Sequence, residues 1–201
     1  MFVKFLGNNN NNVLEIGCGT GLFSKEISKT NNMITAIDIS PDLIEIAKKR
    51  VIVPNITFIQ ENAHHTHFED NIYDFIVGSS VLHHLDIDIA LKEFYRLLKP
   101  NGKLMFTEPN MMNPQIMVQK NIPFVKKIMG DSPDETAFFR WRINNKLFEN
   151  KYKNIQVTPF DFMHPALPKF LLKDLNKMCL FLESVPIIKE IAGSLIITAA
   201  K

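Results

Sequence analysis

Cysteine is scarce in this sequence, and its two cysteines, Cys18 and Cys179, lie far apart. Neither belongs to a Cys-x-x-Cys or Cys/His pattern, so the sequence predicts no disulfide framework and no cysteine-based zinc site. Two thiols in a chain of otherwise ordinary composition are typical of a reducing compartment, and we therefore expect the protein in the cytoplasm.

An excess of charge of either sign is also missing. The 23 Lys and Arg residues nearly balance the 21 Asp and Glu residues, and the net charge of +2 is too small to predict a polyanionic partner such as nucleic acid. No apolar run approaches the ~18 residues of a membrane helix, so we expect no integral membrane span. The segment before the first predicted strand is too short for a signal peptide.

Strand and helix patterns alternate along most of the chain, and no linker or internal repeat divides it. A length of 201 residues suits a single α/β domain with its own core, spanning 1–201. The alternation predicts a mainly parallel sheet with helices on both faces. The expected parallel strands are 13–16, 33–38, 56–60, 73–78 and 103–108, and the expected helices between them include 40–50 and 87–98.

A glycine loop follows the first predicted strand. The apolar run 13–16 contains Glu15, and glycine then occupies every second position at Gly17, Gly19 and Gly21. Glycine permits positive φ angles and close approach of the backbone to a ligand, and a helical pattern starts directly after the loop. Strand, glycine loop and helix together predict a nucleotide-type cofactor site, although the dinucleotide spacing G-x-G-x-x-G and the phosphate loop are both absent.

This pattern, Glu-x-Gly-x-Gly-x-Gly, resembles the first motif of the class I S-adenosylmethionine (SAM) methyltransferases. A carboxylate beside the loop suits a cationic sulfonium better than a pyrophosphate. The resemblance covers about 13–108 and implies SAM as cofactor, with S-adenosylhomocysteine (SAH) as product and no metal. In this loop it assigns cofactor contacts to Glu15, Gly17, Cys18, Gly19 and Gly21.

The resemblance also implies the complete fold. It predicts a Rossmann-like, doubly wound sheet of seven mostly parallel strands with helices on both faces. The last two strands, 154–160 and 194–199, would close it as an antiparallel pair. Family members usually carry one or two helices before the first strand, and the short start of this chain predicts that they are missing.

The ends of the later strands supply further cofactor residues. Asp38 follows the second strand about 20 residues after the glycine loop, the offset at which an acid reaches ribose hydroxyls; the alternative is an exposed acid before a helix. The resemblance implies that Asn62, with Ala63 after it, meets adenine through the Asn62 carbonyl, unless it is a simple turn residue. It also places Ile39 against the adenine face and Ser79 under the methionine part of the cofactor.

Two residues at the same edge are candidate catalytic groups. His84, more than its neighbour His83, is suited to take a proton from an acceptor near neutral pH. Glu108, at the end of the fifth strand, would orient the acceptor or take its proton. The alternatives are a histidine that only packs in a polar loop and a structural acid before the turn at Pro109.

The acceptor is predicted as a small molecule, a lipid or a sugar-linked compound. The chain lacks the Asn-Pro-Pro-aromatic run with which nucleic-acid methyltransferases grip a flipped base. We expect 110–151 to form a cap on the acceptor side, with a helix over 135–151. The amphipathic stretch 170–191 packs against the sheet or touches a membrane surface. The repeat His64-His65-x-His67 joins no acid or cysteine cluster, so we expect no metal there.

Two other functions stay open on the sequence alone. One is a SAM-binding homologue without turnover, such as a partner subunit; the other is a nicotinamide oxidoreductase, against which the glycine spacing argues. A homodimer is also compatible with the sequence.

Overall fold

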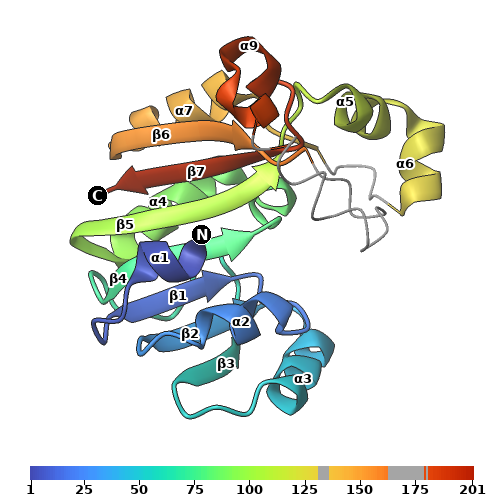
Figure 1. Ribbon diagram of the computed structural model, residues 1–201. Helices are drawn as coiled ribbons and strands as arrows, with labels where there is room; N and C mark the ends of the chain where they lie inside the picture. The colour runs from blue at the N-terminus through green and yellow to red at the C-terminus, as the bar shows by residue number, and fades with distance from the viewer. Residues whose placement is uncertain (131–135, 163–178, 180) are drawn as a thin grey trace.

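The computed structural model describes residues 1–130, 136–162, 179 and 181–201. One sheet of seven strands forms its centre, with helices on both sides (Figure 1). The strands are β1 (Asn12–Ile16), β2 (Met33–Asp38), β3 (Ile56–Gln60), β4 (Tyr73–Ser79), β5 (Leu98–Pro109), β6 (Lys153–Phe160) and β7 (Ser194–Ala200). The helices are α1 (Phe2–Leu6), α2 (Leu22–Ile27), α3 (Pro41–Arg50), α4 (Ile87–Leu97), α5 (Pro114–Asn121), α6 (Pro123–Met129), α7 (Arg140–Glu149) and α9 (Pro186–Lys189), with a 3-10 turn at Leu82–His84.

The strand order is β3-β2-β1-β4-β5-β7-β6. The first five strands pair in parallel, and β7 runs antiparallel to both β5 and β6. This confirms the predicted doubly wound sheet and its antiparallel last strand. The order reverses between β1 and β4, so the carboxyl ends of these two strands flank the position where open α/β sheets bind ligands.

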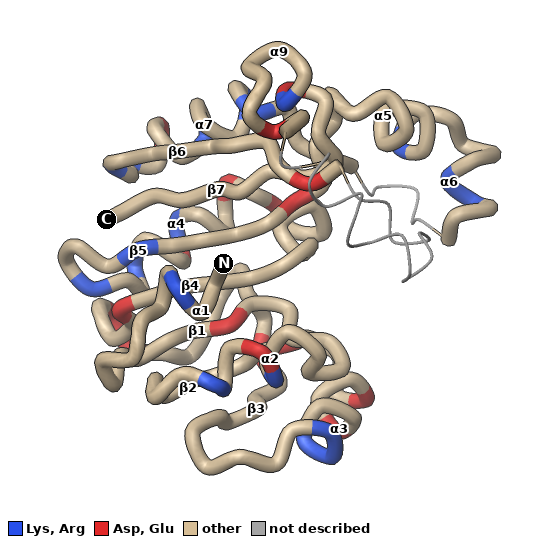
Figure 2. Tube along the Cα trace, in the orientation of Figure 1, with Lys and Arg blue, Asp and Glu red and all other residues tan. Residues whose placement is uncertain are grey.

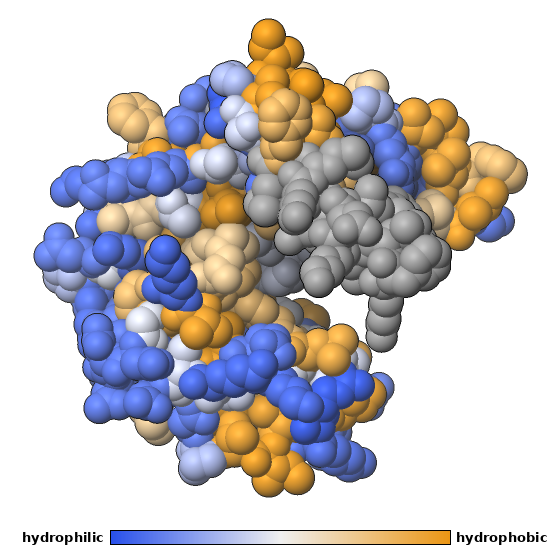
Figure 3. All heavy atoms as spheres, in the orientation of Figure 1, coloured by the Kyte–Doolittle hydropathy of each residue, from blue (hydrophilic) through white to orange (hydrophobic). Residues whose placement is uncertain are grey.

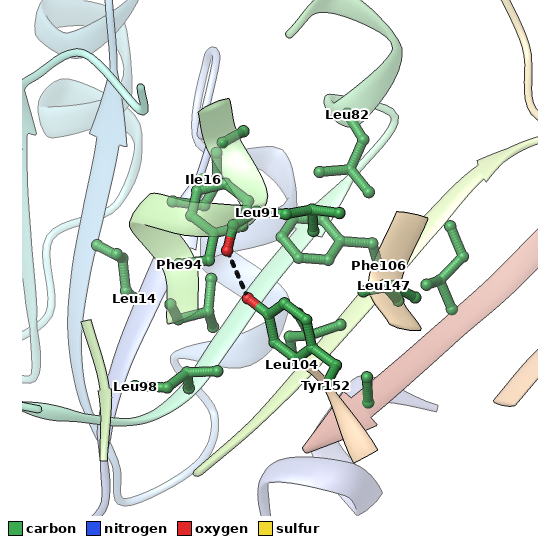
Figure 4. Close-up of a cluster of buried hydrophobic side chains, with 14 of the residues drawn as sticks. Leu14, Ile16, Leu82, Leu91, Phe94, Leu98, Leu104, Phe106, Leu147 and Tyr152 are labelled. Atoms are coloured by element: carbon green, nitrogen blue, oxygen red, sulfur yellow. Dashed lines mark hydrogen bonds between the residues drawn. The ribbon is translucent and has the colours of Figure 1, made fainter. Parts of the chain in front are cut away.

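Alternate residues of the strands pack into two cores. Leu14 and Ile16 of β1 face a core closed by α4 and α7, whereas Val13 faces the core under α1, α2 and α3. In the first core the Tyr152 hydroxyl donates to the Leu91 carbonyl at 2.9 Å, so a buried polar group is satisfied within the apolar cluster (Figure 4). Burial on both faces explains the nearly continuous apolar runs of these strands.

Several boundaries differ from the sequence-based expectation. The segment before β1 forms a short helix, α1, whose Leu6 is buried. The segment after β5, for which we expected a cap with a helix only over 135–151, also contains α5 and α6, which lie beyond the carboxyl end of β5 (Figure 1). Helix α7 begins at Arg140 rather than 135. Strand β5 already starts at Leu98, directly after α4, because the residue before Pro100 favours extended backbone.

Residues 170–178 and 180 of the amphipathic stretch 170–191 lie outside the described residues; in the remainder, α9 begins at Pro186. Every helix that the structure describes falls short of the length and hydrophobicity that a bilayer crossing requires. In the described part of the chain, Lys and Arg are spread over several helices and turns rather than gathered in one stripe (Figure 2).

Candidate cofactor site

A cavity of about 410 Å³ opens at the carboxyl ends of β1 to β4. This volume lies in the usual range for small-ligand sites. Two of the described residues that line it are acids, Asp38 and Glu61, and none of these described residues is Lys or Arg. The lining residues are Ile16, Gly17, Ile37, Asp38, Ile39, Leu43, Glu61, Asn62, Ala63, His64, Ser80, Val81, His84 and Leu85. Within the described ranges the cavity therefore offers apolar walls and negative charge, but no Lys or Arg for a phosphate.

The three glycines of the loop have positive φ angles of 66°, 51° and 78° at Gly17, Gly19 and Gly21. A Cβ on Gly17 would collide with the Val81 side chain, whereas one on Gly19 would meet nothing within 4 Å. A Cβ on Gly21 would come within 3.1 Å of the Ala47 Cβ. Gly17 lines the cavity; Gly19 and Gly21 shape the turn into α2, whose N-cap is Gly21.

Asp38 holds this loop in place from the end of β2. Its Oδ2 accepts from the Gly19 N–H at 2.8 Å, and its Oδ1 accepts from the Ser40 N–H at 3.0 Å. The Cys18 N–H donates to the Ile37 carbonyl at 2.9 Å, which adds a second link between loop and β2. A carboxylate has about four acceptor positions, so Asp38 retains capacity for ligand hydroxyls at the cavity wall.

Glu15 lies beneath the loop rather than in the cavity. Its side chain is fully buried and its Oε1 accepts from the Ser24 Oγ at 2.9 Å. Its Oε2 has no hydrogen-bond partner in the described part of the chain. Burial, opposed by the Ser24 bond and reinforced by the charge of Asp38, raises the pKa of Glu15 to about 8. Cys18 is also buried and outside the cavity lining, and burial raises the pKa of its thiol.

Asn62 and His64 form a short hydrogen-bonded unit at the end of β3. The Asn62 Oδ1 accepts from the His64 backbone N–H at 3.0 Å and lies 3.1 Å from the His64 Nδ1. On the other side of the ring, the Asp86 N–H donates to the His64 Nε2 at 2.9 Å. The carbonyl that the sequence assigned to the adenine amino group is thus engaged within the protein. The role of His64 was missed, although an Asn two residues before it is typical of such a turn.

Glu108 supports the loop after β4 from below. It is 1% exposed, and its Oε1 accepts from the Val81 and Leu82 N–H groups at 2.9 and 2.8 Å. Its Oε2 lies 2.6 Å from the Nδ1 of His83, which is also buried. Glu108 does not line the cavity, whereas His84 does, with its ring centroid 4.1 Å from that of His83.

The remaining predicted residues divide between the cavity and the sheet. Ile39 and Ala63 line the cavity, but Ser79 does not; its Oγ accepts from the Thr107 Oγ at 3.0 Å. Ser80, with a φ of 54°, takes the place expected of Ser79 at the wall. Within the described ranges, no group of three or more His, Cys, Asp or Glu side chains is arranged to hold a metal ion.

Comparison with known proteins gives a consistent result. The methyltransferase domain family model matches residues 14–106. The chain is 36% identical over 104 residues to a ubiquinone/menaquinone biosynthesis C-methyltransferase of Haemophilus ducreyi, covering 48% of this chain and 40% of that protein. It is 38% identical over 100 residues to malonyl-[acyl-carrier protein] O-methyltransferase 1 of Ilyobacter polytropus, covering 48% and 37%. The chain thus matches less than half of the length of either relative.

The fold has close counterparts among solved structures. A SAM-dependent methyltransferase of Thermotoga maritima, described as a possible histamine N-methyltransferase, superposes with a TM-score of 0.71 at 20% identity, over 99% of this chain and 86% of that one. The family match coincides with the strands and loops that build the cavity. Residues 14–106 thus match the methyltransferase domain family, and the fold is that of the class I SAM-dependent methyltransferases.

Proposed function

We propose that this protein binds SAM in the cavity at the ends of β1 to β4 and transfers its methyl group to a small-molecule or lipid acceptor. The observation that carries this proposal is the lining of the cavity. It stands beside a glycine loop, yet its lining, among the residues that the structure describes, contains two acids and no Lys or Arg. A dinucleotide pyrophosphate would lack a cationic partner there, whereas a cationic ligand without phosphates is favoured.

The residues present fit such a ligand. We assign the ribose hydroxyls to Asp38, which keeps acceptor capacity after binding the loop. The apolar side chains of Ile39 and Ala63 supply walls for the adenine ring. We assign the methionine part of the cofactor to the backbone of the glycine loop, at Gly17, Cys18, Gly19 and Gly21. We place Glu15 and Ser79 behind that part of the site. When bound, SAM supplies a methyl group on a positively charged sulfur that becomes a neutral thioether on transfer.

We assign the role of general base to His84. It lines the cavity, while His83 beside it is tied to Glu108, so the loop that carries His84 is held from below. A proton leaving an acceptor hydroxyl, amine or acidic carbon would pass to the His84 ring. Glu108 acts in this assignment as a positioning residue, because its oxygens are engaged by Val81, Leu82 and His83.

The acceptor side is apolar. Helices α5 and α6 lie beyond the same edge of the sheet, and on the face drawn in Figure 3 hydrophobic residues gather at α6, beside hydrophilic ones at α5. Their exposed large apolar side chains are Met117, Val118, Ile122, Phe124, Ile128 and Met129. We propose that 110–151 forms the acceptor side of a single domain. The names of the relatives, a quinone-biosynthesis and a malonyl-carrier-protein methyltransferase, are consistent with an apolar or carrier-linked acceptor.

A turnover assay tests the proposal. Purified protein is incubated with SAM and a panel of quinols, acyl thioesters and small amines, and released SAH is measured. SAH formation that depends on one acceptor class supports methyl transfer. SAM binding without turnover across the panel would instead favour a non-catalytic, SAM-binding subunit.

A further inference from the structure

The protonation pattern of His64 is fixed by its neighbours. A backbone N–H can only donate, so the Asp86 N–H at 2.9 Å makes the His64 Nε2 an acceptor. A neutral imidazole then carries its proton on Nδ1, which donates to the Asn62 Oδ1 at 3.1 Å. The ring is therefore a directional link from Asp86 to Asn62.

The same reasoning fixes the orientation of the Asn62 amide. Its Oδ1 also accepts from the His64 backbone N–H at 3.0 Å, so exchanging the oxygen and nitrogen of the amide would place two donors face to face. Both lone pairs of Oδ1 are thereby used. In the part of the chain that the structure describes, the Asn62 Nδ2 group makes no hydrogen bond, and Asn62 lines the cavity.

We propose that His64 is a positioning residue of the cofactor site, which turns the Asn62 amide so that its N–H₂ group, rather than its carbonyl, meets the base. Asn62 would then recognise a hydrogen-bond acceptor, a ring nitrogen of adenine, and not the exocyclic amino group. This inference rests on the proposed SAM site and specifies how that site reads its base.

The His64 ring also joins two walls of the cavity. Asn62 and Ala63 belong to the segment after β3, whereas Asp86 is the N-cap of α4 and directly follows the lining residue Leu85. The hydrogen bond between the His64 Nε2 and the Asp86 N–H spans 22 residues of sequence. His64 thus decides whether Asn62 offers adenine a donor or an acceptor, and it also links the two walls of the cavity.

Calorimetric titration with SAH tests this assignment without an acceptor. Asn62→Asp keeps an acceptor but removes the donor, so we expect SAH affinity to fall about tenfold. In the double variant Asn62→Asp with His64→Ala, the carboxylate is no longer held by the His64 ring and can turn. We expect the double variant to bind SAH at most about threefold more weakly than His64→Ala alone. His64→Asn, which retains a donor near the Nδ1 position, should bind SAH better than His64→Ala. His65→Ala, an exposed neighbouring histidine, is the matched control and should bind like wild type.

The outcomes separate the two levels of the proposal. If wild-type protein fails to bind SAH, the proposed function and this inference fall together. If wild type binds SAH and folded Asn62→Asp binds it equally well or more tightly, only the inference is overturned. ¹⁵N NMR of the free protein provides an independent check, because the His64 ring must be protonated on Nδ1; the Nε2–H tautomer would overturn the assignment.

Discussion

Removal of the Glu108 carboxylate should destabilise the loop that carries His84 more than any surface change. Its oxygens accept from two backbone N–H groups, of Val81 and Leu82, and approach the Nδ1 of His83 at 2.6 Å. In Glu108→Ala these groups lose their partner at a site where Glu108 itself is 1% exposed. In Glu108→Gln the amide oxygen can still accept from both N–H groups.

The magnitude follows from the number of groups left unpaired. A buried donor without a partner costs about 1–3 kcal/mol, so two N–H groups, one of them only half-buried, amount to about 3 kcal/mol for Glu108→Ala. That is a large share of the roughly 5–15 kcal/mol by which a domain is stable. We expect Glu108→Gln to lose about 1 kcal/mol, because only the contact with His83 changes.

Equilibrium unfolding in urea, followed by circular dichroism, measures both losses. Glu26→Ala is the matched control: Glu26 pairs with Lys29 on the surface with a side chain 62% exposed, and its removal should change the midpoint little. Equal losses for the Ala and Gln variants, or a loss below about 1 kcal/mol for Ala, would refute the assignment of Glu108 as support of the loop.

Three further predictions address the glycine loop and the candidate base. Glu15, with its pKa raised to about 8, keeps its proton in the folded state while the unfolded chain loses it near the ordinary value of 4.5. Wild-type stability should therefore fall between pH 4.5 and 8, on the order of 1 kcal/mol per pH unit, and Glu15→Gln should remove this slope in urea titrations at pH 5 and 8; an unchanged slope contradicts the assignment. Gly17→Ala should weaken SAH binding in calorimetry at least tenfold through the collision with Val81, while Gly19→Ala, with open space around its Cβ, should lose clearly less; equal losses would exclude that collision as the cause. His84→Ala should lower kcat and remove the acid limb of the pH–rate profile, and a kcat unchanged across pH would show that His84 is not a base.

The sheet and the cofactor edge could be predicted because their signals are local. Short apolar runs mark β1 to β4, and the positive φ angles of the loop fall on glycines. Asp38 was predicted as a ribose contact from its offset after the glycine loop; the structure shows its bond to the Gly19 N–H, and the ribose contact stays a prediction.

Other features depend on contacts between distant residues. The pair of His83 and Glu108 lies 25 residues apart and forms only because β4 and β5 are neighbours, so no spacing rule predicts it. The turn of the Asn62 amide depends on the start of α4, which supplies the Asp86 N–H. Helix α5 did carry a local signal, an Asn113 N-cap with proline at the first helical position, which outweighs the loose pattern around it.

Titration calorimetry with SAH and NAD, on wild type and Asp38→Ala, tests the central claim most directly. A cavity whose described lining has two acids and no Lys or Arg predicts that SAH binds and NAD does not. Asp38→Ala should weaken SAH binding at least tenfold, because it removes both the ribose acceptor and the bond to the Gly19 N–H. Binding of NAD with no binding of SAH would contradict the account.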